Sequence, residues 1–139
     1  MNSSKTKPGF SLIEVILATA VFSLLVTALV GITSYGEESA VIAGDRARAA
    51  FLADEGLEVI RNLKSDSFLN LPDGTYGLLL SDGRWYLSGS EDITGIFTRQ
   101  VTVTTFAPDR LEVTVRVSWP ETLQRTGEVS LVAQFANWP

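Results

Sequence analysis

The most constraining feature of the sequence is an apolar run of about 23 residues, from Phe10 to Ile32, that contains one charge, Glu14. As a helix rising about 1.5 Å per residue, this run is about 34 Å long, enough to cross a hydrocarbon core of about 30 Å. Lys5 and Lys7 precede it, and basic residues favour the cytoplasmic side of a membrane. We therefore expect one membrane-spanning helix, with the N-terminus in the cytoplasm and the rest of the chain outside.

Composition narrows the chemistry that the chain can perform. With 139 residues there is room for one domain. The absence of His and Cys excludes Cys/His zinc sites, thiolate nucleophiles and histidine general bases. The net charge of -5 argues against a general nucleic-acid binder, although a local basic patch stays open. We expect no enzyme, no catalytic residue, no cofactor and no metal site.

Two ordinary explanations of the apolar run stay open. One is a secretory signal cut after Ala18-Thr19-Ala20, but Glu14 would then stand inside a short apolar region, and the run continues to Ile32. The other is a plain uncleaved anchor, in which Ser11-Leu12-Ile13-Glu14 is only a capping box that starts the helix. Neither explains why a carboxylate stands where charge is costly.

The residues Gly9, Phe10 and Glu14 support a third interpretation. A short basic leader ending in Gly, a Phe directly after it and a Glu four residues further on resemble the type IV pilin and type II secretion pseudopilin family. The resemblance implies cleavage between Gly9 and Phe10 by a prepilin peptidase, N-methylation of Phe10, and assembly into a filament through the apolar helix. It implies as partners other pilin subunits, the prepilin peptidase, an inner-membrane assembly platform and, before assembly, membrane lipid.

The chemistry of the processed end is consistent with this resemblance. Cleavage would create an α-amine on Phe10, whose ordinary pKa of about 7.7–8 leaves it mostly cationic. Glu14 lies one helical turn along and can pair with the amine of its own chain or of a neighbour. An unpaired carboxylate in a filament core is costly, so the pair would select the register of docking rather than add much net stability.

The rest of the chain predicts an α+β fold, the pilin fold that the resemblance implies. A leader over 1–9 and an apolar helix over 10–32 are followed by an amphipathic continuation over 33–66, with a local weakness expected at Gly31 to Gly36. The helix stripe is Leu52, Gly56, Val59, Ile60 and Leu63. Residues 67–139 predict an antiparallel β-sheet, with a hairpin over 75–80 and 84–88, a loop over 89–95 and three alternating strands over 97–105, 111–119 and 129–135.

The member of the family is suggested by residues 53–62, whose E-G-L-E-x-x-R-N pattern resembles minor pilins of the pilus-modification (PilV-like) type. Two alternatives stay open: a type II secretion pseudopilin, and a membrane-anchored extracellular binding domain that does not polymerise. In the filament case, the exported part would end in an extracellular or periplasmic filament.

For three further groups of residues, we favour an ordinary role in solvation or packing over a functional one. The acids would be solvated loop residues rather than calcium ligands, the aromatics sheet packing rather than an adhesive surface, and the arginines a solvated face rather than a DNA strip. The groups are, in that order, Asp82, Glu91 and Asp92; Trp85, Tyr86, Trp119 and Trp138; and Arg84, Arg99, Arg110, Arg116 and Arg125.

Overall fold

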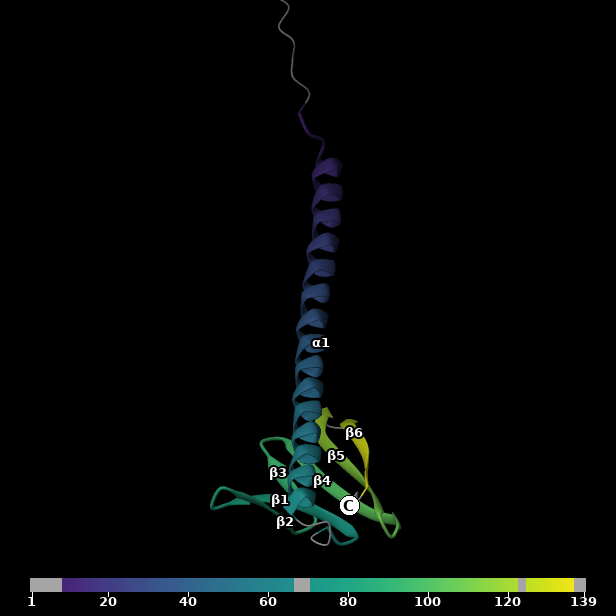
Figure 1. Cartoon of the computed structure of the whole chain (residues 1–139). Helices are drawn as coiled ribbons and strands as arrows, with labels where there is room; N and C mark the ends of the chain where they lie inside the picture. The colour runs from purple at the N-terminus through teal and green to yellow at the C-terminus, as the bar shows by residue number, and fades with distance from the viewer. Residues whose placement is uncertain (1–8, 67–70, 123–124, 137–139) are drawn as a thin grey trace, which may run out of the picture. The chain divides into compact units, whose positions relative to one another are not determined.

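The computed structural model describes residues 9–66, 71–122 and 125–136. In these residues, one long helix is followed by six strands (Figure 1): α1 (Leu12–Asp66), β1 (Gly74–Ser81), β2 (Arg84–Ser88), β3 (Asp92–Thr94), β4 (Phe97–Ala107), β5 (Arg110–Thr122) and β6 (Arg125–Ala136). The chain divides into two compact units, Met1–Val41 and Ile42–Pro139, and α1 contributes to both. The α+β architecture predicted from the sequence is confirmed.

The helix α1 is continuous through both glycines that were expected to weaken it. Gly31 and Gly36 keep helical geometry, and a methyl group added at either would meet open space. No close contact within the unit Met1–Val41 therefore requires a glycine at either position. A reduced helix stability at these positions stays a prediction.

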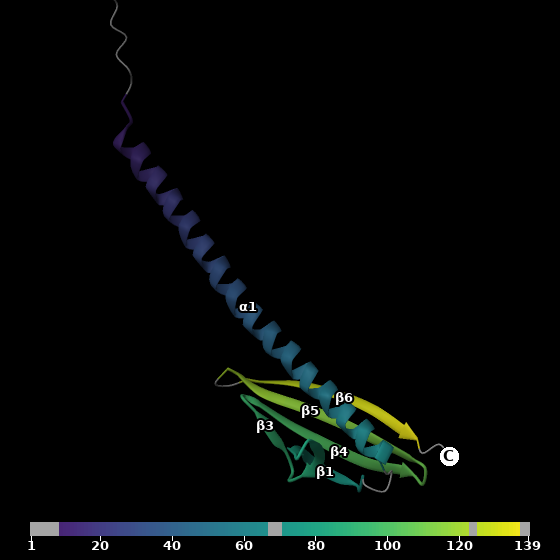
Figure 2. The same cartoon turned by 60° about the vertical axis from the view of Figure 1, so that its left-hand side comes forward.

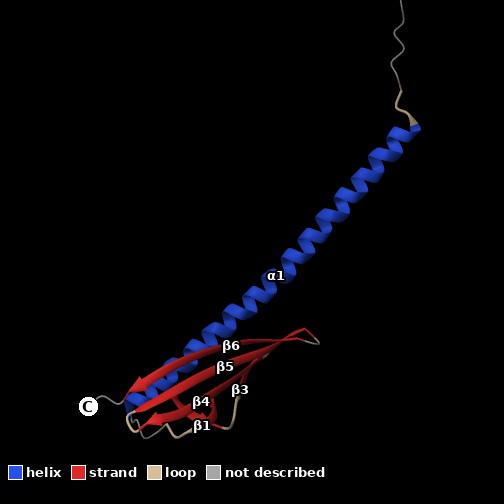
Figure 3. Cartoon of the chain, turned by 90° about the vertical axis from the view of Figure 1, so that its right-hand side faces the viewer, coloured by secondary structure: helices blue, strands red, loops and turns tan. Residues whose placement is uncertain are grey.

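The sheet is antiparallel, with the order β2-β1-β4-β5-β6. Figure 3 shows β4, β5 and β6 side by side. The hairpin β1–β2 is confirmed, and its turn residues Asp82 and Gly83 both have positive φ, as a type I′ turn requires. The predicted loop over 89–95 is wrong in part, because it contains the short strand β3, which pairs with β4. The sheet is therefore not a plain meander: β1 and β3 pair with successive parts of one edge of β4.

The end of the second predicted long strand also differs from the prediction. Trp119 and Pro120 were expected to end the strand, but β5 continues to Thr122 with an irregular register beside Pro120. A proline is tolerated where the ladder is irregular, because its missing N–H is then not needed.

The core of the unit Ile42–Pro139 lies between the C-terminal part of α1 and one face of the sheet, as Figure 2 shows. Buried rows run across the strands, with Val101 of β4 opposite Val115 of β5, and Val115 opposite Leu131 of β6. The alternation predicted for the three long strands is confirmed, with every second residue facing the core, apart from Thr105 at the end of the first predicted range, which is exposed. The helix stripe is confirmed and is wider than expected, since Ala49, Ala53 and Leu57 are also buried.

The end of α1 is tied to the far strand of the sheet. Lys64 Nζ donates a hydrogen bond to the carbonyl oxygen of Ala136 at 2.5 Å. A cation in the last turn of a helix is also favoured by the helix dipole.

Candidate functional site

The apolar part of α1 presents hydrophobic side chains on all sides. Leu12, Leu24 and Ile32 are between 69% and 80% exposed, and the most apolar stretch of the helix has none of its residues buried. By length and composition this helix can cross a membrane. An apolar surface of this extent needs lipid or other protein around it, so the unit Met1–Val41 is built for surroundings other than water.

The N-terminal end of α1 brings together two of the residues singled out in the sequence. Gly9 and Phe10 precede the helix, and Glu14 lies in its first turn. Phe10 and Glu14 line one groove on the helix surface, together with Val15, Ala18, Thr19 and Phe22. Phe10 and Glu14 therefore face the same groove at the start of the helix.

Glu14 is not held by a local capping interaction in this structure. Its backbone N–H donates to the carbonyl oxygen of Ser11 at 3.0 Å, and the N–H of Val15 donates to the same oxygen at 3.3 Å. Among the described residues, neither the Ser11 hydroxyl nor the Glu14 carboxylate has a side-chain hydrogen bond or an ion pair. The S-x-x-E pattern therefore leaves the carboxylate available to another partner.

Hydroxyl groups within the apolar stretch bond to the helix backbone itself. Thr19 Oγ1 donates to the carbonyl of Ile16 at 2.9 Å, and Ser23 and Thr27 each donate to the carbonyl four residues earlier at 2.8 Å. Thr33 makes a similar bond to Val30 at 2.9 Å. The hydroxyl groups of these side chains therefore have a hydrogen-bond acceptor within the helix and do not need water.

The E-G-L-E segment lies in the second unit, where its residues have separate structural roles. Glu55 accepts a hydrogen bond from Arg99 at 3.0 Å, and Leu57 is buried in the core. Gly56 lies against the sheet so closely that a Cβ there would come within 2.9 Å of Val115 Cγ1. Glu58 pairs with Arg61 along the helix surface. The segment therefore fits α1 to the sheet.

Arg99 is buried, in contrast to the solvated position expected for the arginines. It was grouped with the solvated arginines, but it is only 4% exposed and lies under α1. Its guanidinium donates to the Leu52 carbonyl at 3.0 Å and to both oxygens of Asp92, at 2.9 and 3.2 Å. Asp92 also accepts from the N–H of Leu78 at 2.8 Å. The solvated face predicted for the arginines is therefore wrong for Arg99, because its guanidinium binds α1 and Asp92 of β3, and Asp92 in turn binds β1.

The sequence contained a signal for this arrangement. Arg99 stands in an alternating row between Phe97 and Val101, at a position that points inward. A charged residue at an inward position requires partners, and the acids of the preceding loop were the nearest in sequence. Asp92 was expected to be a solvated loop acid, and this is wrong, because its side chain is only 18% exposed and pairs with Arg99. No group of three or more potential metal ligands occurs among the described residues.

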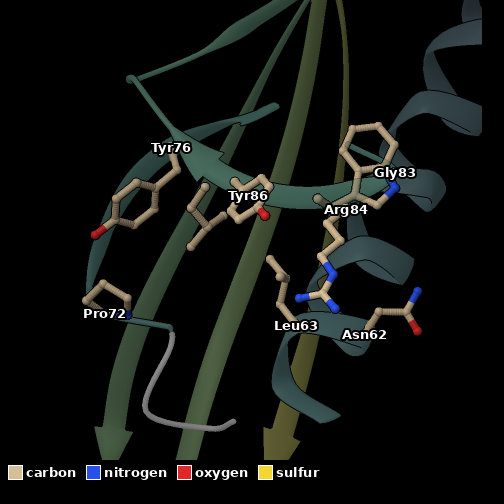
Figure 4. A pocket seen from close by; sticks show the side chains of 9 residues that line it. Asn62, Leu63, Pro72, Tyr76, Gly83, Arg84 and Tyr86 are labelled. Atoms are coloured by element: carbon tan, nitrogen blue, oxygen red, sulfur yellow. The ribbon is translucent and has the colours of Figure 1, made fainter. Parts of the chain in front are cut away.

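The aromatic residues are not gathered on one surface. Trp119 is buried, while Trp85 and Tyr86 line a hollow of about 1030 Å³ with Tyr76 and Arg84. Figure 4 shows Arg84 close to the end of α1, beside Asn62 and Leu63, with Tyr76 on the other side of the hollow. Trp138 lies outside the described residues. Aromatic faces beside guanidinium and amide groups are common in binding sites, but nothing buried and unpaired in this hollow points to a ligand.

The comparison with protein families bears on the N-terminal site. The family model described as "Prokaryotic N-terminal methylation motif" matches residues 4–30, the part of the chain that contains Gly9, Phe10, Glu14 and most of the apolar helix. No significant similarity was found to curated proteins or to solved structures. The matched motif lies on a long apolar helix that continues into a helix packed on an antiparallel sheet, and it supports the resemblance to the type IV pilin and pseudopilin family.

Proposed function

We propose that the protein is a minor subunit of a type IV pilus-like filament, made as a precursor that a prepilin peptidase cuts after Gly9. The observation that supports this most is the methylation motif on a helix whose apolar side chains are exposed on every side. Such a helix is suited to a bilayer before assembly and to a bundle of like helices afterwards. The role is structural, and the protein acts by assembling.

In this proposal Glu14 sets the register of assembly. It is the only ionisable side chain between Phe10 and Ile32, and its carboxylate has no partner within the described chain. A neighbour that docks with its processed Phe10 amine beside this carboxylate removes the cost of an unpaired buried charge, which is several kcal/mol when one partner is missing. A neighbour docked one turn out of register leaves both charges unpaired.

The first test is the chemical identity of the mature N-terminus. Mass spectrometry of the protein purified from cells with an active prepilin peptidase should find N-methylated Phe10 as the first residue. Gly9→Val, which places a bulky side chain at the cut, should leave the leader attached. An intact N-terminus in the unchanged protein would show that processing does not occur at Gly9.

The second test separates assembly from membrane insertion. Glu14→Gln preserves the size of the side chain and removes its charge, so we expect normal insertion and loss of incorporation into filaments. Glu37→Gln, which changes an exposed acid of the same helix beyond the apolar run, is the matched control and should incorporate normally. Equal incorporation of both variants would favour the rival, a membrane-anchored domain that does not polymerise.

The third test addresses which kind of subunit this is. The resemblance of residues 53–62 to pilus-modification minor pilins supports a minor subunit, with the N-terminus cytoplasmic before assembly and the C-terminal unit outside. Quantitative mass spectrometry of sheared surface filaments should then find the protein at a small fraction of the main subunit. A protein absent from surface filaments, whose deletion blocks secretion, would instead be a type II secretion pseudopilin.

A further inference from the structure

The strand β6 forms one edge of the sheet. It pairs with β5, and among the described residues no other strand pairs with it. Figure 3 shows β6 as the outermost of the three long strands. In an antiparallel ladder, alternate residues direct their N–H and C=O groups away from the neighbouring strand. One side of β6 therefore presents backbone groups that a further strand can bind.

The two end strands of the sheet differ in how they are protected. The opposite end strand, β2, has five residues and begins with a charge, Arg84, and short or charged edges resist pairing with other chains. The strand β6 has 12 residues, and its charges are confined to Arg125 and Glu128 at its start. The remaining uncharged stretch, residues 129–136, also contains no proline. It therefore lacks the charges and prolines that usually protect an edge.

The core is also incomplete along this edge. The inward residues of β5 are buried, whereas the inward residues Val129, Leu131 and Ala133 of β6 are only partly buried. On the outer face of β6, Val132 is 59% exposed. A strand added beside β6 would cover apolar side chains on both faces of the sheet. Hydrophobic burial and backbone hydrogen bonding therefore favour the same kind of partner, an extended strand.

We propose that β6 pairs with β6 of a second copy of the chain, antiparallel and about a two-fold axis at Val132. This register sets Val132 opposite its own copy and Ser130 opposite Gln134 of the other chain. Every pair joins residues of the same face, as an antiparallel ladder requires. The two copies of Glu128 are then about eight residues, or about 26 Å, apart along the ladder, so like charges do not meet. Pairing centred on Glu128 itself would place its two copies together, at a cost.

A second copy suits this edge because the uncharged stretch is complementary to itself. A two-fold contact brings the same surface of both chains together. In the proposed register, Val129 meets Phe135 and Leu131 meets Ala133, so apolar side chains lie opposite apolar ones. The two polar residues of the overlap, Ser130 and Gln134, lie opposite each other. The inference concerns the unit Ile42–Pro139 and does not depend on processing at the N-terminus.

Disulfide formation in the full chain, in detergent and under mild oxidation, tests the pairing. The chain has no Cys, so an introduced cysteine reports contact between copies. Residues opposite each other in an antiparallel pair have Cα atoms about 4.5–5.5 Å apart, within the span of a disulfide. Val132→Cys should therefore form a disulfide dimer. Ser130→Cys is the matched control, exposed on the same face of the same strand, but its two copies would lie about 13 Å apart, too far for a disulfide.

Mixed variants provide a second measurement. Ser130→Cys and Gln134→Cys should each stay monomeric alone and form a disulfide dimer when mixed. Adding Val132→Lys to both chains places two cations on the axis and should lower this yield about tenfold or more, because like charges at an interface cost several kcal/mol. Adding Thr104→Lys instead, at an exposed position of β4, should leave the yield unchanged. All these side chains are exposed, so each variant should keep the near-ultraviolet circular dichroism of the unchanged chain.

Three results would overturn the proposal, whatever the outcome of the assembly tests at Glu14. The first is the absence of a disulfide dimer from Val132→Cys. The second is an equal yield from Val132→Cys and Ser130→Cys, which indicates random collision. The third is a dimer from a mixture of Ser130→Cys and Val132→Cys without one from Val132→Cys alone, which places the pairing in a different register.

Discussion

Replacing Arg99 with methionine tests whether the buried guanidinium holds the helix, β3 and β1 together. Methionine has similar length and fills the space without a charge. The change removes two bonds to Asp92, one to Glu55 and one to the Leu52 carbonyl. It leaves the Asp92 carboxylate, whose side chain is 18% exposed, with the Leu78 N–H as the donor that remains among the described residues.

The magnitude follows from the exposure of each partner. Glu55 is 48% exposed, so solvent screens its pair with Arg99 and this arm contributes little. The bonds to Asp92 are shielded, and breaking one side of a buried pair costs about 3–5 kcal/mol. Because Asp92 keeps some access to water, we expect a loss of about 3 kcal/mol. For a domain of this size, that corresponds to a melting temperature lowered by roughly 10–25 °C.

Thermal unfolding of the full chain in detergent, followed by near-ultraviolet circular dichroism, measures this loss in the sheet-containing unit. The matched control is Arg116→Met, because Arg116 is an exposed arginine on β5 with one pair, to Glu128 at 3.6 Å, and should change stability by less than about 0.5 kcal/mol. Adding Asp92→Asn to Arg99→Met should restore part of the stability, because it removes the unpaired charge. If Arg99→Met and Arg116→Met melt within about 4 °C of each other, a difference of under about 1 kcal/mol, the buried bonds of Arg99 do not stabilise the fold.

Three further changes test close contacts, each by the same melting measurement. Gly77→Ala should be the most damaging, at about 3 kcal/mol or more, because its Cβ would lie 2.3 Å from the backbone carbonyl carbon of Glu91; wild-type stability would show that this backbone can move. Gly56→Ala should cost about 1–2 kcal/mol, since crowding of Val115 outweighs the helix propensity gained, and a more stable variant would contradict the close approach. Asp73→Ala should cost about 1–2 kcal/mol, because one carboxylate oxygen of Asp73 accepts hydrogen bonds from both the N–H and the hydroxyl of Thr105 in β4, each at 2.7 Å. An unchanged melting temperature would show that these two bonds do not contribute to stability.

Much of the fold was predictable because each element has a strong periodic signal. The alternation around Val113 and Val115 predicted a strand with one buried face, and the spacing of Val59 and Ile60 predicted the helix stripe that covers it. The apolar run was equally clear, since few structures other than a membrane or filament helix use 23 such residues. These signals are local, and a sequence displays local patterns directly.

The features that were missed depend on contacts between distant parts of the chain. The strand β3 has only three residues, and its pairing with β4 is supported by the Asp92–Arg99 interaction rather than by any periodicity of its own. The indole N–H of Trp119 has no hydrogen-bond partner among the described residues, and this depends on which residue β6 places opposite it. At the N-terminal site, the pattern of Gly9, Phe10 and Glu14 was enough to propose roles, whereas the pairing that we propose for Glu14 involves a neighbouring chain, which the structure of one subunit does not contain.

The internally bonded hydroxyls of the apolar helix have a consequence for how the chain moves between surroundings. Because Thr19, Ser23 and Thr27 donate to their own backbone, they neither lose hydrogen bonds on leaving water nor require new ones on entering a bundle. In the proposed assembly, transfer from lipid to a packed bundle is then nearly neutral along most of the segment, since both surroundings are apolar. The proposal thus concentrates the free-energy difference at Glu14, so that one carboxylate biases the direction of transfer while the remaining helix slides at little cost.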